Sequence, residues 1–395
     1  MHRLAADEPV RAVTRYRYAV LAAGTFAQTS YSAIWFGVAV MAPRLRSGYG
    51  LSLGQTGFLI SCSLVGSVVS LIPWGIATDR VGERLVLVIG LAGCGGFLLA
   101  AASAHAFWPL AILLAAAGAS GASVQSASGR AVMHWFAQRE RGLALGIRQT
   151  AIPISGFLAA VALPPIVHAG GVGWGFASLG LACLAGAAVG GIVLRERTGA
   201  EGPEIVVASE PLRDRRLWTL SVGSSLILAP QLCVAGFAVL FLHEERGLSE
   251  SAAAAVLALM QLLAVAGRVG AGRWSDVRAS RVGPLRTIAL AATVLVGLTA
   301  LLVAAPLAVL LPVLVAAGVV SMSWNSLSFA AAVEFAGHGK SGSAIGLQQT
   351  VLNVPGAAYP ALFGALVAAT TWRLGYAVVA LFPLAGWRVL RALTR

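Results

Sequence analysis

The stretch Gly75-Ile-Ala-Thr-Asp79-Arg80-Val-Gly82-Glu83-Arg84 separates two long apolar runs, at 54–77 and 85–104. Each run is long enough to cross the hydrocarbon layer of a bilayer, which takes about 20 helical residues. Four of the last six residues of the stretch are charged, so the stretch cannot enter that layer at low cost. We therefore predict a tight polar loop between two membrane-spanning helices.

The composition of the whole chain favours the same class of protein. Of the 395 residues, 58% are hydrophobic and only 11% are charged, against roughly 25% in an ordinary soluble domain. The net charge of +13 is spread over the segments between apolar runs instead of gathering on one polar segment. We expect an all-α integral membrane protein whose partner is the lipid bilayer, and no nucleic-acid partner.

Twelve apolar runs predict twelve transmembrane helices. The expected spans are 18–42, 54–77, 85–104, 108–133, 143–167, 174–194, 217–242, 251–274, 287–305, 307–333, 344–369 and 374–389. The first span is too long for a signal peptide, so we expect it to be retained. The predicted organisation is a tail at 1–17, a six-helix bundle at 18–194, a polar linker at 195–216, a second bundle at 217–391 and a tail at 392–395.

An internal repeat relates the two predicted bundles. Several residues return after 197 to 200 positions, and these pairs include Asp79 and Asp276, Gln149 and Gln349, and Trp174 and Trp372. Asp, Gln and Trp are uncommon in this chain, so their matches at a near-constant offset indicate duplication. We predict two pseudo-symmetric six-helix bundles around a central cavity.

The distribution of Lys and Arg predicts the orientation in the membrane. With the N-terminus in the cytoplasm, the inner loops and tails hold 21 of the 28 cationic residues, and the outer loops hold Arg44, Arg46, Arg246 and Arg373. Because short cytoplasmic loops are enriched in Lys and Arg, both termini should be cytoplasmic. We expect the protein in the plasma (inner) membrane.

The stretch at 75–84 resembles the signature of the major facilitator superfamily of secondary transporters, and the resemblance covers essentially the whole chain. Glu83 departs from the pattern, which has a basic residue there more often. The second copy, from Gly272 to Asp276, degenerates after the aspartate. The resemblance implies two halves that rock around a substrate site near the bilayer midplane.

The resemblance also implies a conformational latch on the cytoplasmic side. Its residues in this chain would be Gly75, Asp79, Arg80, Gly82, Arg84, Gly272 and Asp276. A glycine lets helices approach closely, an aspartate favours the positive end of a facing helix, and the arginines can pair with acids of the opposite half. The alternative for the arginines is the general cytoplasmic bias of positive charge.

Three arginines fall within predicted spans, and no Asp or Glu lies deep in any span. Arg268 lies eight residues before Asp276, roughly 12 Å from the membrane edge. Its spacing resembles that of the helix-eight arginine that binds carboxylate in monocarboxylate-type members of the family. A substrate contact and a structural contact are both open for Arg268, as are a cavity and an interfacial position for Arg148. Arg130 is expected at the interface.

Uncharged polar residues inside the spans are further candidates for the substrate site: Gln28, Tyr31, Trp35, Gln125, Gln231, Asn325, Gln349 and Asn353. Each of them either lines the cavity or makes a hydrogen bond to another helix, because a buried amide needs a partner in both cases. Glu334 and His134, near span ends, are candidate proton carriers.

These observations favour a secondary transporter that moves a small organic anion by symport or exchange through alternating access. A buried arginine without a fixed carboxylate lacks a counter-charge, which the substrate can supply. The alternative is an efflux pump for hydrophobic compounds, although Pro153 and Gly156 retain only part of the antiporter pattern of helix five. A sensor or an intramembrane enzyme is more remote. We expect a monomer with no enzymatic activity, metal or cofactor.

Overall fold

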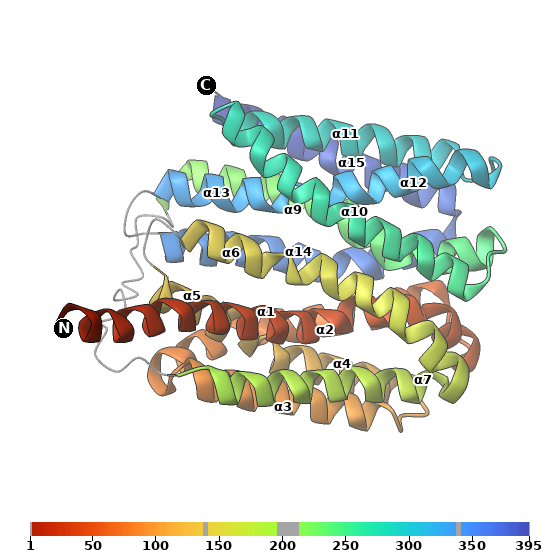
Figure 1. Ribbon diagram of the computed structural model, residues 1–395. Helices are drawn as coiled ribbons and strands as arrows, with labels where there is room; N and C mark the ends of the chain where they lie inside the picture. Colours follow the sequence, from red (N-terminus) through yellow and green to blue (C-terminus); the bar gives the residue numbers. More distant parts are fainter. Residues whose placement is uncertain (1, 137–140, 196–212, 337–340, 395) are drawn as a thin grey trace.

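The computed structural model describes residues 2–136, 141–195, 213–336 and 341–394, and these ranges are helical without strands. The helices run along a common axis, and both chain ends lie at the same end of the molecule (Figure 1). We call this end, with Tyr16, Arg195 and Arg215, the termini side. The other end, with Tyr49 and Gly171, is the far side.

Each half of the chain forms one group of helices. The N-terminal half consists of α1 (His2–Tyr49), α2 (Leu53–Val81), α3 (Glu83–Ala101), α4 (Phe107–Gly121), α5 (Ser123–Trp135), α6 (Arg141–Gln149) and α7 (Ala151–Val193). The C-terminal half consists of α9 (Arg215–Leu240), the π-helical turn η1 (Phe241–Glu245), α10 (Glu250–Val277), α11 (Val282–Leu301), α12 (Leu307–Met322), α13 (Asn325–Ala336), α14 (Ser341–Ala369), α15 (Trp372–Leu390) and the 3-10 turn η2 (Arg391–Thr394). The predicted linker at 195–216 lies mostly outside the described residues.

Ten helices in the described ranges are long and apolar enough to cross a membrane. One of them, at 146–193, contains two predicted spans, which meet at a kink where Gly171 has a φ of 75°. The first predicted span lies in α1, whose Thr, Gln and Ser side chains between 25 and 32 make it more polar than these ten. With α1 and the division of α7, the twelve predicted spans form two six-helix bundles.

Three of the predicted spans are interrupted instead of continuous. The breaks lie at Ala122 between α4 and α5, at Thr150 between α6 and α7, and at Ser323 and Trp324 between α12 and α13. Pro153 explains the second break, since it has no N–H to donate to the carbonyl of Gln149. The apolar pattern runs through all three breaks, so hydropathy alone does not reveal them.

Glycines allow the closest helix crossings of the N-terminal half. At the crossing of α2 and α4, a Cβ on Gly66 would clash with the carbonyl of Ala115, and one on Gly118 would clash with the backbone of Ser63. Small residues permit such backbone approach in membrane helices. The expectation that Gly75 and Gly272 serve the same purpose is wrong for this conformation, because no heavy atom lies within 4 Å of a Cβ added to either one.

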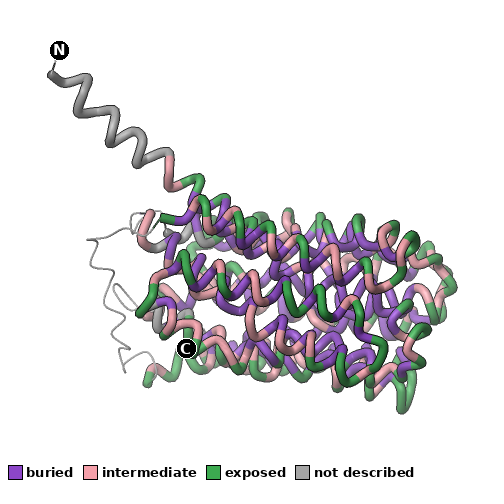
Figure 2. The backbone as a smooth tube through the Cα atoms, turned by 90° about the horizontal axis from the view of Figure 1, so that it is seen from below, coloured by how far each residue is buried: buried purple, intermediate pink, exposed green. Residues whose placement is uncertain are grey.

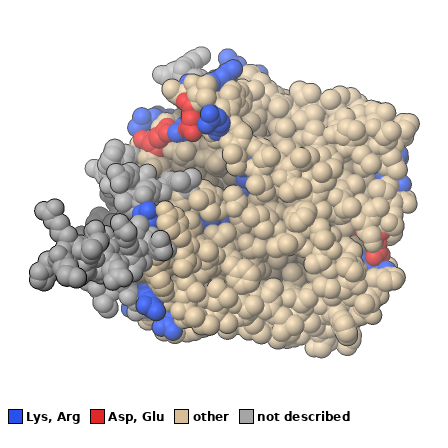
Figure 3. Space-filling model, in the orientation of Figure 1, with Lys and Arg blue, Asp and Glu red and all other residues tan. Residues whose placement is uncertain are grey.

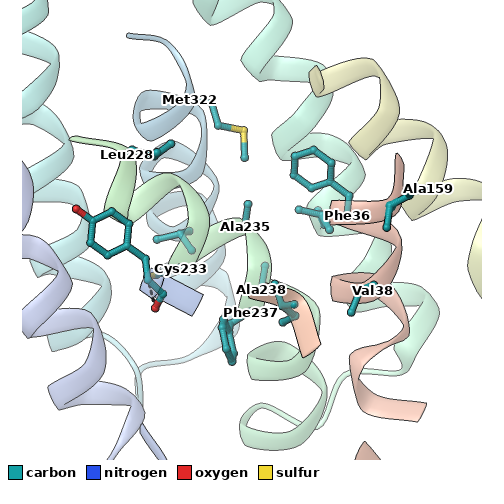
Figure 4. Packing of buried hydrophobic residues seen from close by; sticks show 14 of the residues in the cluster. Phe36, Val38, Ala159, Leu228, Cys233, Ala235, Phe237, Ala238 and Met322 are labelled. Carbon is teal, nitrogen blue, oxygen red and sulfur yellow. Dashed lines mark hydrogen bonds between the residues drawn. The ribbon is translucent and has the colours of Figure 1, made fainter. Parts of the chain in front are cut away.

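The two halves pack against each other mainly through α1 with α9, α2 with α14, and α7 with α10. Figure 4 shows Phe36 and Val38 of α1 beside Ala235 and Ala238 of α9. Buried residues lie where helices face one another, and exposed ones follow the outer faces (Figure 2). On the face drawn in Figure 3, charged side chains gather at the two ends of the molecule with a broad uncharged band between them. This band matches the hydrocarbon layer of a membrane.

The crossing of α2 and α4 makes a stability prediction. Gly118→Val should lower the melting temperature of the purified protein in detergent, because overpacking a close crossing costs about 1–3 kcal/mol. The matched control is Gly96→Val on α3, where an added Cβ meets nothing within 4 Å. Thermal unfolding followed by tryptophan fluorescence measures both, and equal melting temperatures for the two variants would contradict the packing account.

Candidate functional site

A cavity of about 110 Å³ lies between the two halves. Eight of the ten predicted substrate residues line it, and they are Gln28, Trp35, Gln125 and Arg148 from the N-terminal half and Gln231, Asn325, Gln349 and Asn353 from the C-terminal half. Most of the remaining lining is apolar: Phe36, Ile60, Leu64, Ile152, Leu228, Leu232, Ala235, Phe329, Leu352 and Pro360. The cavity thus combines an apolar wall with one arginine and several amides.

Arg148 of α6 is the one charged residue among the described residues that line this cavity, and it is only 7% exposed. Its Nε donates to Ser128 Oγ at 2.8 Å, and its Nη2 donates to Gln28 Oε1 at 2.9 Å and to the carbonyl of Gln125 at 3.2 Å. Among the described residues no hydrogen bond involves its Nη1. The side chain is therefore held rigidly while one end of its guanidinium group stays available.

The C-terminal half repeats this cluster without the charge. Gln348, the repeat mate of Arg148, donates to Ser328, the mate of Ser128. Ser328 in turn lies 2.5 Å from Ser224 of α9, the helix that corresponds to α1 in the repeat. The two halves therefore build the same three-helix polar cluster, and only the N-terminal copy carries a cation.

Arg268 of α10 does not line the cavity in this conformation. Its Nε donates to the carbonyl of Met322 at 2.9 Å, its Nη1 donates to the carbonyl of Gln149 at 3.0 Å, and its Nη2 lies 3.5 Å from Asn325 Oδ1. Gln149 belongs to the other half, and its carbonyl lacks a helical donor because Pro153 has no N–H. Arg268 thus ties the two halves together at a helix break, which is the structural alternative left open for it above.

Tyr31 also lies outside the cavity, although its neighbour Trp35 lines it. The Tyr31 side chain is fully buried, shares a short hydrogen bond with Ser67 and donates to the carbonyl of Gly118 at 3.2 Å. These partners belong to α2 and α4, so Tyr31 joins helices within the N-terminal half.

Among the described residues, no ion pair of the predicted latch joins the two halves in this conformation. Arg80 and Arg84 are exposed and have no ion pair in the described part of the chain, and the side chain of Asp79 lies outside it. Gly82 has a φ of 90° and joins α2 to α3, a backbone conformation that favours glycine. Asp276 pairs with Arg281 of its own half. This ion pair on the termini side therefore lies within one half, and the latch between the halves stays a prediction.

Both candidate proton carriers lie away from the cavity. Glu334 pairs with Arg281 at 2.7 Å, and the carboxylates of Glu334 and Asp276 raise the pKa of Arg281 above its usual value. His134 Nδ1 lies 3.0 Å from Glu83 Oε1, and Glu83 is buried. Neither Glu334 nor His134 is among the residues that line the cavity.

Ion pairs between the halves occur at the far side, where the sequence analysis did not expect a latch. Arg44 Nε lies 2.7 Å from Glu250 Oε1, and Arg46 pairs with Glu244. The sequence contains a signal for these ion pairs. Arg44 and Arg46 lie on the far side, whereas most Lys and Arg residues of the chain lie on the termini side. Close packing of α2 on α14 accompanies these pairs, since a Cβ on Gly57 would clash with the carbonyl of Pro360. The far side is therefore closed.

Comparisons with known proteins agree with this architecture. The sequence profile described as Major Facilitator Superfamily matches residues 24–360. A Mycobacterium tuberculosis protein named as an uncharacterised MFS-type transporter is 36% identical over 88% of this chain and 79% of its own length. Shorter matches are a gallate transporter of Pseudomonas putida, 32% identical over 33% of this chain and 30% of its own, and a hexuronate transporter of Bacillus subtilis, 25% identical over 30% and 28%.

Solved structures share the fold. A bacterial homologue of the human lysosomal transporter Spinster, in an inward-facing and occupied conformation, superimposes with a TM-score of 0.80 over 96% of this chain and 97% of its own at 15% identity. The xylose transporter XylE of E. coli, in a partially occluded inward-open conformation, gives 0.79 over 96% of this chain and its full length at 14% identity.

The contact of Arg268 with Gln149 predicts an energetic coupling between Arg268 and Pro153. Pro153→Ala restores a backbone N–H that can bond the carbonyl of Gln149, so Arg268→Ala should destabilise that variant less than it destabilises the parent. We expect a coupling energy of about 1 kcal/mol, measured by reversible unfolding in mixed micelles. The control is Pro165→Ala, farther along α7. Its effect on the free energy of unfolding should simply add to the effect of Arg268→Ala. If the effects of Pro153→Ala and Arg268→Ala on the free energy of unfolding were strictly additive, Arg268 would not stabilise the free carbonyl of Gln149.

Proposed function

The chain is a member of the major facilitator superfamily, and from this we propose that it is a secondary transporter that moves a small organic anion across the plasma membrane by alternating access. The family and the named relatives are those of transporters and not of enzymes. The observation that carries the choice of an anion is Arg148, a buried cation with an uncommitted Nη1 in a cavity whose described lining residues include no Asp or Glu.

An anion is the ligand that this cavity would bind most strongly. A charge held in an apolar interior is costly unless it is paired, and the present partners of Arg148 are a hydroxyl, an amide and backbone carbonyls. A guanidinium group binds carboxylate strongly through charge-assisted hydrogen bonds. A carboxylate entering the cavity would therefore supply the missing counter-charge at Nη1.

The size of the cavity favours a small substrate. A cavity of about 150 Å³ holds one benzene molecule, so a cavity of about 110 Å³ limits the substrate in this conformation to a short chain or at most a single ring. Efflux of hydrophobic compounds remains the second candidate, and the apolar wall with Phe36, Leu64 and Phe329 favours it. A large lipophilic compound would need a wider cavity, and an uncharged one would not form an ion pair with Arg148.

The two partly matching relatives fit an anionic substrate. Gallate and hexuronate, which their names give as cargo, are both carboxylates. For coupling we favour exchange over proton symport, because Glu334 and His134 are held in pairs outside the cavity and none of the described residues that line it has a carboxyl group.

For the orientation we propose that the termini side is cytoplasmic and that the present conformation is inward-facing. The excess of Arg and Lys in the segments of the termini side supports this orientation, and the ion pairs of Arg44 and Arg46 close the opposite side. In the outward-facing state, Arg80 and Arg84 would then form the latch by pairing with acids of the C-terminal half.

The test measures uptake of a panel of radiolabelled small carboxylates into proteoliposomes. The vesicles are either preloaded with the unlabelled anion or left empty. Arg148→Gln should lower the efficiency of uptake by roughly 10- to 100-fold, the effect of losing one charge-assisted hydrogen bond in a buried site, and Arg148→Lys should restore part of it. Arg373→Gln, which removes an exposed arginine, is the control for the lost charge. If Arg148→Gln takes up anions at the rate of the parent, the anion site is ruled out. If cells that express the protein resist lipophilic compounds, and Arg148→Gln does not change that resistance, efflux is favoured.

A further inference from the structure

Three polar side-chain atoms of the cavity lining lack hydrogen-bond partners among the described residues: Trp35 Nε1 in the N-terminal half, and one amide atom each of Gln231 and Asn353 in the C-terminal half. Gln231 of α9 is only 7% exposed, and its Oε1 has no hydrogen-bond partner among the described residues. The Nδ2 of Asn353, on α14, likewise has none. Both residues line the cavity. An unpaired buried polar atom costs free energy, so a cavity that retains a donor and an acceptor without partners is complementary to a ligand that supplies both.

The unpaired amides lie deeper in the cavity than Arg148. Gln231 follows Ser224 by seven residues, about 10 Å along the helix, and Ser224 belongs to the polar cluster that repeats the cluster of Arg148. Asn353 follows Gln348, the repeat mate of Arg148, by five residues, about 7.5 Å along α14. The cation therefore lies toward the termini side of the cavity and the two amides toward its far end.

The chemistry of the amides selects the group that they can bind. An acceptor oxygen and a donor N–H that line the same cavity match a hydroxyl group, which donates one hydrogen bond and accepts others. A second carboxylate fits less well, because it would face the Gln231 oxygen without a cation beside it. An alkyl group would leave both polar atoms without partners.

We propose that the transported anion carries a hydroxyl group at the end opposite its carboxylate, and that Gln231 and Asn353 bind this hydroxyl while Arg148 binds the carboxylate. The inference rests on the proposed anion transport and adds the substrate class, a small hydroxylated carboxylate. Such a molecule contacts both halves at once, the charged end on α6 and the hydroxyl on α9 and α14. Its two ends thus link the bundles that must move relative to each other.

Matched pairs of anions test the proposal with the purified full-length protein in proteoliposomes. The pairs are 4-hydroxybenzoate with 4-methylbenzoate, and 4-hydroxybutanoate with pentanoate, in which a methyl group replaces the hydroxyl at similar size. For at least one pair we expect the hydroxylated anion to be taken up roughly tenfold more efficiently, since sites built to hydrogen-bond a hydroxyl reject the analogue that lacks it. Gln231→Leu and Asn353→Leu should each bring the ratio close to one by lowering uptake of the hydroxylated anion.

The control variant is Thr350→Leu, which changes an exposed polar residue of α14 that is not in the lining and should leave the ratio as in the parent. Uptake of both members of each pair at equal efficiency overturns the hydroxyl site and leaves anion transport standing; it would mean that water alone occupies Gln231 and Asn353. A preference that survives both leucine variants also overturns it. Uptake of none of the four anions, or uptake that Arg148→Gln does not change, overturns the anion transport itself.

Discussion

Burial of two guanidinium groups in an apolar interior is the constraint around which the centre of this protein is built. Arg148 and Arg268 are each 7% exposed, and the helices around them supply acceptors where an unbroken apolar helix would offer none. Arg268 uses the carbonyls of Met322 and Gln149, both beside helix breaks. Because backbone carbonyls inside a bilayer are free only where a helix is interrupted, the breaks and the buried cations depend on each other.

The two arginines differ in the state of their donors, and that difference separates their roles. All three nitrogens of Arg268 have protein acceptors, one of them from the other half, so Arg268 contributes to how the bundles are held. Arg148 is positioned by Ser128 and Gln28 of its own half, and its Nη1 has no hydrogen bond to any residue that the structure describes. In the second copy of the repeat, Gln348 replaces Arg148. A duplicated cluster that is charged in one half and neutral in the other suits a ligand with one charged and one neutral end.

Sequence predicted the depth of residues better than the direction in which they point. Polar residues inside apolar runs stand out because burying them is costly, and most of those chosen this way do line the cavity. Tyr31 and Trp35 show the limit, since they are four residues apart on one helix, yet Tyr31 bonds Ser67 and Gly118 while only Trp35 reaches the cavity. For Arg268 the sequence left a substrate contact and a structural contact open, because two of its acceptors are backbone carbonyls beside the helix breaks at Thr150 and Ser323, which leave no mark in hydropathy.

The contacts that close the far side are of two kinds, and their strengths bear on how the protein can change state. The pairs Arg44 with Glu250 and Arg46 with Glu244 are partly exposed, and exposed ion pairs contribute only about 0–1 kcal/mol each. The contact of Gly57 with Pro360 is backbone packing, which has no such screening by solvent. Opening the far side must separate both kinds of contact. The glycine contact should therefore contribute most of the free energy of opening, and the ion pairs should mainly align the helices when the far side closes. A ligand bound to Arg148 and to the amides of α9 and α14 would act on the same α2–α14 interface from inside, because Asn353 and Pro360 lie on one helix seven residues apart.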